Sequence, residues 1–434
     1  MEYSAVLDYL YSKLPMFYRE GKIAYKNNLD NIKALDDYLN FPHRNFMTIH
    51  IAGTNGKGSV SHMLAAILQT AGYKTGLFTS PHLMDFRERI KVNGQMISKD
   101  EVVEFVTVNY EILERIQPSF FEMSVAMAFN YFYNKQVDIA VIETGLGGRL
   151  DSTNIITPLV SVITNISLDH TDILGNTLAA IAFEKAGIIK PEIPVVVGES
   201  NDEYNKVFLD AAQINNSEIT FADSIYSVMN SLESFQDVQI LFLKKNGIVL
   251  DNPLKLDLLG HYQQKNIISV FATVDILRKA GLKISQEVLF SALEKVCEIT
   301  GLLGRWQVLG QNPLIACDTG HNEEGIRWVV SQLKRVPYRH LHFVFGMVND
   351  KDTTSILKLL PSEATYYFTK ANLPRAMDEK KLASAAKSFN LNGGTYEKVK
   401  DAFLAAKNNA QPEDLIFVSG SSFVVAEVLA NRII

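Results

Sequence analysis

The chain contains 434 residues, of which 47% are hydrophobic and 21% are charged. This apolar content is enough to build sizeable cores, which excludes global disorder, and the length predicts two or three domains. The formal net charge of -6, from 42 Lys and Arg against 48 Asp and Glu residues, argues against a nucleic-acid-binding protein, although small anionic ligands remain compatible with it.

The N-terminal part of the chain alternates short strand-like runs with longer amphipathic segments. The predicted strands cover residues 46–51, 74–79, 138–143, 160–165 and 193–198. The predicted helices cover residues 59–71, 122–135 and 177–188, and Gly72 ends the first of them. Because crossover helices join parallel strands, this order predicts an α/β fold with a mostly parallel sheet covered on both faces.

The texture of the sequence changes in the middle of the chain. Residues 217–258 contain short strand-like runs broken by turn residues at 245–247 and 251–253, which predicts an antiparallel hairpin or meander. Two helices, predicted at 262–280 and 285–297, then close the first half of the chain.

From residue 302 the alternation of strands and helices starts again. The predicted strands cover 314–317, 340–345, 364–369 and 414–419. The predicted helices cover 323–336, 378–389, 396–409 and 421–431. We therefore expect an N-terminal domain at 1–298 and a smaller, Rossmann-like C-terminal α/β domain at 299–434.

The cysteine content and the N-terminal sequence indicate in which cellular compartment the protein is found. Cys297 and Cys317 are the two cysteines, which excludes a disulfide scaffold and a thiolate zinc site within one chain. The first residues lack the basic and apolar regions of a secretory signal, and no apolar run reaches the length of a membrane span. We expect a cytoplasmic protein with no membrane partner.

A glycine-rich segment at residues 53–59 lies between the first predicted strand and the first predicted helix. Glycines there let backbone N–H groups converge on phosphate oxygens, and the helix N-terminus adds partial positive charge. Lys57 can then reach the terminal phosphates, and the Ser59 hydroxyl can bind Mg²⁺. The spacing departs from the standard phosphate loop, since two residues separate Gly53 from Gly56. An ordinary turn is the alternative, and the flanking strand and helix favour nucleotide binding.

Polar side chains follow three predicted strands of the first sheet. Glu143 ends one strand, His170 follows the next, and Ser80 follows the strand after the first helix. The carboxyl ends of parallel strands share one edge, so Glu143 is placed to bind Mg²⁺ beside the phosphate loop. His170 is either a ligand or a hydrogen-bonded structural residue, and Ser80 is either a ligand or a turn cap.

Lys185 stands on a largely apolar predicted helix. Full burial of its ammonium would be costly unless the group were paired or neutral. The alternative is a lysine that extends to water or pairs with Glu184 or a phosphate.

These segments together resemble the folylpolyglutamate synthase and dihydrofolate synthase family of the Mur ligase superfamily. The resemblance covers nearly the whole chain, and its most specific motif is the block at 143–154. The other motifs are 53–59, 79–83, 87–90, 184–190, 260–263 with Asn266, 304–306, 318–322 and 350–352. The segment 318–323 departs from the family's usual Asp-Gly-Ala-His-Asn-Pro but keeps Asp318, His321 and Asn322.

The resemblance implies a role for each matching residue. In the N-terminal, Mur ligase-like domain, it implies catalytic roles for Lys57, Lys185, His170 and Glu143, with Lys185 carbamylated. It implies a Mg²⁺ site at Ser59, Ser80, Glu143 and His170. It implies ATP contacts at Thr54, Asn55, Gly56, Lys57, Gly58, Ser59, Asn266, Arg305, Asp318 and His321. It implies substrate contacts at Phe86 and Arg87 for the folate, and at His321 and Ser421 for glutamate in the C-terminal domain.

The implied reaction is an ATP-dependent amide ligation. The carboxylate of a reduced folate, of dihydropteroate, or of both would attack ATP to give an acyl phosphate, and L-glutamate would then attack that intermediate. We expect a monomer without a nucleic-acid partner.

A phosphate-loop ATPase or GTPase switch is one alternative, but it leaves Lys185 and His170 without a role. A cell-wall amino-acid ligase is the other, disfavoured because the first predicted strand begins at residue 46, which leaves too little chain for the additional domain that usually binds a nucleotide-sugar.

Overall fold

The computed structural model describes residues 2–15, 28–233, 237–349 and 352–430. The chain divides into two compact units. The first comprises Met1–Leu232, Ile240–Asp257 and Gln263–Gly301, and the second comprises Glu233–Gln239, Leu258–Tyr262 and Leu302–Ile434. Two short segments that the sequence places in the first domain therefore belong to the second unit.

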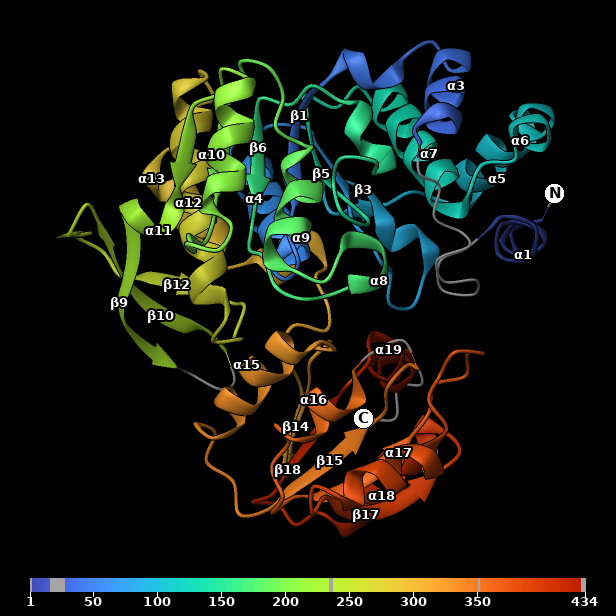
Figure 1. Ribbon diagram of the computed structural model, residues 1–434, viewed down its shortest axis with the longest axis vertical. Coiled ribbons are helices and arrows are strands. Elements are labelled where there is room, and N and C mark those ends of the chain that lie inside the picture. The colour runs from blue at the N-terminus through green and yellow to red at the C-terminus, as the bar shows by residue number, and fades with distance from the viewer. Residues whose placement is uncertain (1, 16–27, 234–236, 350–351, 431–434) are drawn as a thin grey trace. The chain divides into compact units, whose positions relative to one another are not determined.

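An eight-stranded sheet forms the centre of the first unit, in the order β4-β3-β2-β5-β1-β6-β7-β8 (Figure 1). Six strands pair in parallel, while β3 and β4 are antiparallel to their neighbours. The strands are β1 (Met47–Ala52), β2 (Thr75–Phe78), β3 (Ile90–Val92), β4 (Gln95–Met96), β5 (Ile139–Glu143), β6 (Val160–Ile163), β7 (Val195–Val197) and β8 (Ile219–Phe221). The predicted mostly parallel α/β sheet is confirmed.

Helices cover both faces of this sheet, as parallel strands require. Helices α4 and α12 pack on one face, and α7, α9 and α10 pack on the other, where they bury apolar side chains of alternate strand residues (Figure 1). The helices are α1 (Tyr3–Lys13), α3 (Asp30–Tyr38), α4 (Lys57–Thr70), α5 (Lys99–Val108), α6 (Tyr110–Ile116), α7 (Phe120–Asn134), α8 (Thr171–Leu174), α9 (Leu178–Ala186), α10 (Asn205–Ile214), α11 (Ala222–Ile225), α12 (Gln263–Lys279), α13 (Gln286–Leu293) and α14 (Val296–Thr300). The described residues of this unit also form the short 3₁₀ helices η2 (Pro42–Asn45), η3 (Phe86–Arg89) and η4 (Ser152–Ile155).

Most of the region 217–258, predicted as an antiparallel hairpin or meander, forms a small four-stranded sheet in which β10 pairs with β9, β11 and β12. The prediction is wrong for β8, which pairs in parallel with β7 in the large sheet. Its strands are β9 (Tyr226–Glu233), β10 (Gln239–Lys245), β11 (Ile248–Val249) and β12 (Leu254–Leu256). The turn between β10 and β11 has Asn246 and Gly247 at φ 50° and 80°, the conformation that an Asn-Gly hairpin turn requires.

A six-stranded sheet forms the second unit, in the order β13-β14-β18-β15-β16-β17. Only β13 is antiparallel to its neighbour. The strands are β13 (Gln307–Gln311), β14 (Leu314–Cys317), β15 (Leu341–Phe345), β16 (Thr365–Thr369), β17 (Asn392–Tyr396) and β18 (Leu415–Ser419). Helices α15 (Glu323–Leu333), α16 (Thr353–Leu357) and α17 (Glu379–Lys387) pack on one face, and α18 (Val399–Asn409) and α19 (Ser422–Ala430) pack on the other.

Several elements differ from the sequence predictions, and helices α1, α3, α5, α6, α10 and α16 and strand β13 were not predicted. The predicted helix 285–297 is two helices, because the backbone at Lys295 leaves the helical conformation (φ -139°) and the Asp257 carboxylate accepts the Cys297 N–H (2.7 Å). The β3–β4 hairpin was not predicted, although its Asn93-Gly94 turn is a strong local signal. The edge strand β17 was not predicted either, because its exposed Asn-Gly-Gly run lacks the β-branched residues typical of strands.

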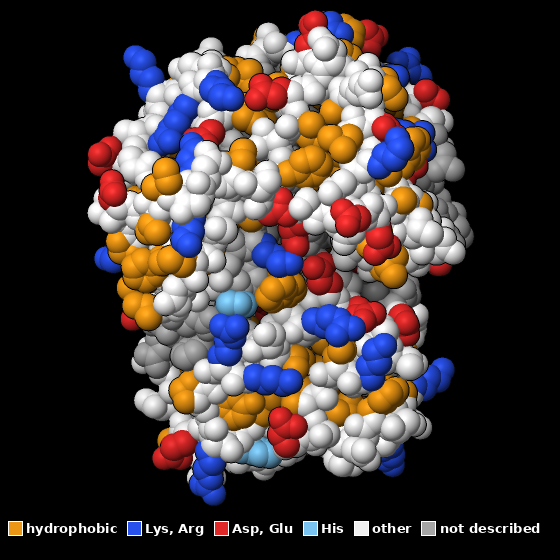
Figure 2. All heavy atoms as spheres, turned by 60° about the vertical axis from the view of Figure 1, so that its left-hand side comes forward, with side chains coloured by type: hydrophobic (Ala, Val, Ile, Leu, Met, Phe, Trp, Pro, Cys, Tyr) orange, Lys and Arg blue, Asp and Glu red, His pale blue; other side chains and the backbone are white. Residues whose placement is uncertain are grey.

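The surface carries charges of both signs. Figure 2 shows Lys and Arg side chains interspersed with Asp and Glu side chains over the face that it draws. Among the helices of the described ranges, none combines the length and the apolar character that crossing a bilayer requires. Of the motif at 350–352, residues 350 and 351 lie outside the described residues, as does residue 431 of the predicted last helix.

Candidate active site

The predicted phosphate loop connects strand β1 to helix α4. Gly53 and Gly56 adopt φ of 149° and 84°, conformations that favour glycine. A Cβ atom at Gly53 would lie 1.8 Å from Thr164 Oγ1, and one at Gly56 would lie 2.2 Å from Asn266 Oδ1. Both positions therefore exclude a side chain, and the binding of phosphate by the loop backbone stays a prediction.

Hydrogen bonds tie this loop to the segment that follows β6. The Thr54 N–H donates to the Asn165 carbonyl (2.9 Å), and the Asn55 N–H donates to Asn165 Oδ1 (2.8 Å). Thr164 Oγ1 donates to the Asn55 carbonyl (2.6 Å), and Asn55 Nδ2 donates to Ser167 Oγ (3.2 Å). Thr54 and Asn55, predicted to contact ATP, therefore also hold the shape of the loop.

Helix α12 supports the loop from a distant part of the sequence. Gln263 Nε2 donates to Ser59 Oγ (3.1 Å), and Asn266 Nδ2 donates to Gln263 Oε1 (2.7 Å). All three side chains are buried. The structure thus brings the predicted residue Asn266 to the phosphate loop. It also assigns to Gln263 a supporting role that the sequence analysis missed, because nothing local marks a glutamine as a loop contact.

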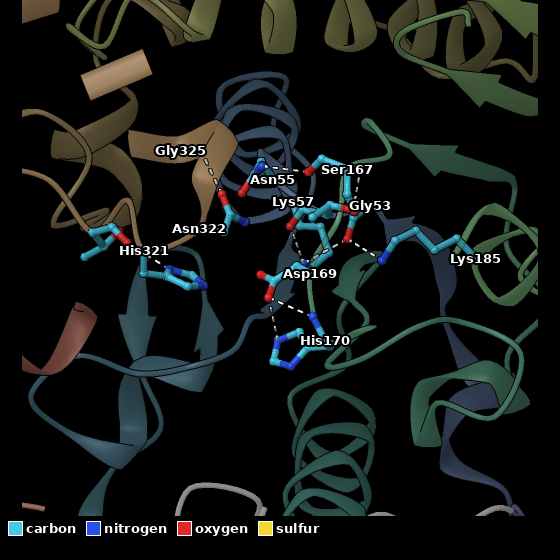
Figure 3. A network of polar contacts seen from close by, with 12 residues as sticks. Gly53, Asn55, Lys57, Ser167, Asp169, His170, Lys185, His321, Asn322 and Gly325 are labelled. Atoms are coloured by element: carbon cyan, nitrogen blue, oxygen red, sulfur yellow. Dashed lines mark hydrogen bonds and ion pairs between the residues drawn. The ribbon is translucent and has the colours of Figure 1, made fainter. Parts of the chain in front are cut away.

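Two lysines converge on one carbonyl of the loop (Figure 3). Lys57 Nζ donates to the carbonyls of Gly53 (3.0 Å) and Thr54 (3.1 Å), and Lys185 Nζ donates to the Gly53 carbonyl (2.8 Å). Lys185 reaches this carbonyl from helix α9, across 132 positions of sequence. The side chains of two predicted catalytic residues therefore meet at the start of the phosphate loop.

The environment of Lys185 favours its neutral form. Its side chain is 3% exposed. Burial, and secondly the positive charge of Lys57, lower the pKa of Lys185 to about 7, although the carboxylates of Asp169 and Asp151 oppose the shift. A substantial fraction of this amine is therefore unprotonated near neutral pH. Of the two states expected for a buried lysine, paired or neutral, this environment favours the neutral one.

This pKa predicts a pH-dependent contribution to stability. Between about pH 7 and the ordinary lysine pKa of 10.5, the unfolded chain holds a proton that folded Lys185 has released, so the free energy of unfolding rises with pH. We expect the wild type to gain stability relative to Lys185→Met across this window, as measured by urea unfolding in CO₂-depleted buffers. Parallel pH profiles of the two proteins would contradict the prediction.

Glu143 and Ser80 lie together at the carboxyl edge of the sheet. Glu143 Oε2 accepts the Ser80 N–H (3.2 Å), and the Glu143 side chain is buried at 3% exposure. A buried carboxylate beside a serine suits a divalent cation, which prefers oxygen ligands. Within the described residues, no group of three or more His, Cys, Asp and Glu side chains is arranged to hold a metal ion. The predicted set has only two such side chains, Glu143 and His170, so it depends on the hydroxyls of Ser59 and Ser80.

His170 stands in the left-handed region (φ 50°) at the start of helix α8. Its backbone N–H donates to Asp169 Oδ1 (2.8 Å), and its Nε2 lies 3.9 Å from the same oxygen. Asp169, which the sequence analysis left without a role, therefore holds the backbone of His170 and also contributes negative charge near Lys185.

The block at 143–154 owes its internal order to a second buried carboxylate, Asp151. Asp151 Oδ2 accepts the N–H groups of Gly145 and Leu146 (both 2.8 Å), and Oδ1 accepts the Thr153 N–H (3.0 Å). Burial raises the pKa of Asp151, while these hydrogen bonds oppose the shift. The signal in the sequence was an acidic residue three positions after the last glycine of a glycine-rich turn.

The same block is bonded to the segment that carries Lys185. The Arg149 N–H donates to the Glu184 carbonyl (2.7 Å), and the Arg149 guanidinium pairs with Glu184 Oε1 (2.8 Å). Asn154 Nδ2 donates to the carbonyls of Arg149 and Gly187 (both 3.0 Å). The two motifs hold each other in place, so Glu184 pairs with Arg149 rather than with Lys185.

The predicted folate residues lie in and beside an aromatic cluster. Phe86 is 1% exposed, and its ring lies 5.6 Å from that of Phe120, centroid to centroid. Arg87 pairs with Asp85 (2.7 Å), and this hydrogen bond raises the pKa of Arg87. Phe86 is therefore a core residue in this structure and Arg87 is already paired, so their contact with a substrate remains a prediction.

The predicted residues of the second unit surround Asp318, which follows β14. Asp318 is 3% exposed, and its two oxygens accept three hydrogen bonds of 2.7 Å, from Gly320 N–H, Trp306 N–H and the Tyr262 hydroxyl. Burial raises the pKa of Asp318, and the bond from Tyr262 opposes the shift. The Asp318 carboxylate therefore stabilises the loop that follows β14 through hydrogen bonds within the protein.

Arg305, His321 and Ser421 lie on loops of this unit. The Arg305 guanidinium donates to Thr319 Oγ1, and His321 Nδ1 lies 3.0 Å from the Thr319 carbonyl. Ser421, which is 3% exposed, accepts the Phe423 N–H (3.2 Å) at the start of helix α19. The structure thus brings Arg305 and His321 together around Thr319, which the sequence analysis did not single out.

Family models match both halves of the chain. Residues 51–274 match the Mur ligase middle domain, and residues 304–422 match the glutamate ligase domain of Mur ligases. The first match begins at the phosphate loop and extends through Asn266. The second begins at Gly304 and extends through Ser421.

Curated relatives cover most of the chain. A dihydrofolate synthase/folylpolyglutamate synthase of Bacillus subtilis is 33% identical over 94% of this chain and 95% of its own length. A probable bifunctional folylpolyglutamate synthase/dihydropteroate synthase of Haloferax volcanii is 32% identical over 98% of this chain, which spans only 50% of that relative.

Solved structures share the architecture of the whole chain. Mycobacterium tuberculosis folylpolyglutamate synthase complexed with ADP matches with a TM-score of 0.88 and 30% identity, covering 99% of this chain and 98% of that one. A bifunctional folylpolyglutamate synthase/dihydrofolate synthase with Mn, AMPPNP and L-glutamate bound matches with a TM-score of 0.84 and 28% identity, covering 99% of this chain and 98% of that one.

Proposed function

Because this chain belongs to the folylpolyglutamate synthase and dihydrofolate synthase family of the Mur ligases, we propose that it is an ATP-dependent ligase that joins L-glutamate to a reduced folate. The observation that carries the proposal is the phosphate loop itself. It has two glycines without room for a side chain and two lysines at its Gly53 carbonyl, at the N-terminus of helix α4. That arrangement places the positive charge of Lys57 and of the N-terminus of helix α4 where a nucleotide phosphate would bind.

The chemistry needs a leaving group, because a carboxylate oxygen leaves poorly. The folate carboxylate attacks the γ-phosphorus of ATP, the bond to ADP breaks, and an acyl phosphate forms. The glutamate amine then attacks the acyl carbon, inorganic phosphate leaves, and the amine loses a proton. Lys57 and the N-terminus of α4 neutralise the charge that builds up on the transferred phosphoryl group.

A divalent cation would be held by Glu143 and Ser80, which the structure brings together, with Ser59 and His170 as the further predicted ligands. Bound there, the cation would shield the negative charge of the nucleotide phosphates. A related structure that contains Mn and AMPPNP supports a divalent metal, and Mg²⁺ is the ion that we propose for this chain.

We propose that Lys185 is carbamylated in the working enzyme. Its lowered pKa leaves a nucleophilic neutral amine, whose nitrogen attacks CO₂ to form an N–C bond and releases one proton to solvent. The product is a carbamate anion beside the Lys57 ammonium, so Lys185 and Lys57 become an attractive pair of opposite charges.

The remaining predicted residues take the roles that the family resemblance implies. Asn266, Arg305, Asp318 and His321 contact ATP, and His321 and Ser421 serve the incoming glutamate. We propose dihydropteroate as a second acceptor, because the Bacillus subtilis relative is named for both activities. We also propose that the active form is a monomer and that its partners are these small molecules.

An assay of ADP release tests this function. We expect ADP to form only when ATP, L-glutamate and an acceptor are all present, and mass spectrometry to detect an acceptor carrying one added glutamate. The panel should include tetrahydrofolate, dihydropteroate and a UDP-linked muramyl acid as the negative control. Equal ATP turnover without acceptor, and no amide product, would instead support a nucleotide-hydrolysing switch.

A further inference from the structure

One short segment, residues 260–266, bears side chains that contact predicted nucleotide residues of each unit. Its residues up to Tyr262 belong to the second unit, and from Gln263, the first residue of helix α12, they belong to the first. The sequence analysis noted this segment as a motif but assigned a role only to Asn266.

In the second unit, the Tyr262 hydroxyl donates to Asp318 Oδ2 (2.7 Å). Burial, reinforced by the neighbouring Asp318 charge, raises the pKa of Tyr262 well above its ordinary value. The phenol therefore stays protonated and remains a hydrogen-bond donor. Gly260 makes room for this ring, because a Cβ atom there would lie 2.6 Å from Tyr262 ring carbons.

The Asp318 carboxylate, held by Tyr262, also fixes the backbone of neighbouring residues. Its remaining bonds fix the N–H groups of Trp306 and Gly320, which are the residues next to Arg305 and His321. Rotation of the Asp318 carboxylate would therefore displace the backbone that carries both of these predicted ATP contacts.

In the first unit, the next residues of the same segment contact the phosphate loop. Gln263 donates to Ser59, and Asn266 lies against Gly56, where it leaves no room for a Cβ atom. Tyr262 is joined to Gln263 by a peptide bond, so the side chains that fix Asp318 and those that fix the phosphate loop are neighbours along the chain.

We propose that Tyr262 is a positioning residue for the nucleotide, which orients Arg305 and His321 through its hydrogen bond to Asp318. The proposal rests on the proposed function, since it takes ATP as the ligand of these residues. It adds to that function a residue whose hydroxyl acts on nucleotide affinity without contacting the reacting atoms.

The test is a double-mutant cycle on nucleotide affinity. With the full-length chain and a fluorescent ADP analogue, Y262F should raise the dissociation constant about tenfold, the effect of losing one hydrogen bond to a charged group. D318N should also weaken binding. The double variant Y262F/D318N should be no weaker than D318N alone, because both substitutions disrupt the same bond.

A matched control separates positioning from general stability. Tyr226 in strand β9 is a buried tyrosine whose hydroxyl also donates to an aspartate, Asp275 in helix α12 (2.6 Å). Y226F should lower the melting temperature about as much as Y262F does, yet leave the dissociation constant for the ADP analogue unchanged.

The proposal is overturned if Y262F binds the ADP analogue like the wild type, if Y226F weakens binding equally, or if the effects of Y262F and D318N add. A Y262F chain that does not fold would also overturn it, by making the hydroxyl structural. A wild type that binds ADP but makes no amide refutes the proposed function alone.

Discussion

Replacing Lys185 with alanine should lower the ligation rate by about a hundredfold to a thousandfold, the effect of removing one preorganised charged group from a phosphoryl-transfer site. If the working group is a carbamate, added formate or acetate should restore part of the rate, because a small carboxylate can occupy the space that the Lys185 side chain leaves. The measurement is the rate of ADP release with saturating ATP, glutamate and acceptor, with and without the carboxylate.

Lys91 provides the control for the loss of a buried lysine. It is 4% exposed, burial lowers its pKa, and its Nζ donates to the Thr300 carbonyl (2.7 Å), away from the phosphate loop. Formate should not raise the activity of Lys91→Ala. If Lys185→Ala keeps the wild-type rate, Lys185 has no catalytic role, and if formate restores nothing, the carbamate proposal loses its support.

Replacing Gly56 with alanine should lower nucleotide affinity by about a hundredfold, as expected for two lost hydrogen bonds to a charged phosphate. The added Cβ atom would meet Asn266 Oδ1 at 2.2 Å, and the residue would have to keep a φ of 84° that alanine disfavours. Either the loop or Asn266 must move, and both are predicted to contact ATP. Titration with a fluorescent ADP analogue measures the effect.

Gly72 provides the matched control for Gly56, because it lies just beyond the other end of helix α4. Its φ is 90°, but no atom lies within 4 Å of an added Cβ. Gly72→Ala should therefore cost only about 1 to 2 kcal/mol of stability, from the left-handed backbone, and leave nucleotide affinity unchanged. Equal affinities of the Gly56 and Gly72 variants for the analogue would show that the Gly56 site does not bind nucleotide.

Local patterns along the chain predicted most of the architecture. Hydrophobic periodicity reports which side of a strand or helix is buried, so the parallel strands and their crossover helices were found within a few residues. Some elements that were missed had weak local signals, unlike the β3–β4 hairpin. Strand β17 is exposed and glycine-rich, and the break between α13 and α14 depends on the Asp257 carboxylate from a distant strand.

The sequence by itself determined the chemistry at the strand ends and the phosphate loop, because each motif consists of residues that are neighbours in the chain. Only the tertiary structure decided which of these residues meet. Lys185 donates to the Gly53 carbonyl, Phe86 is buried in an aromatic core, and Asp318 accepts a hydrogen bond from the Tyr262 hydroxyl. Such contacts depend on strand order, register and the burial of charges. These are properties of the packed molecule, and no periodic pattern in the sequence encodes them.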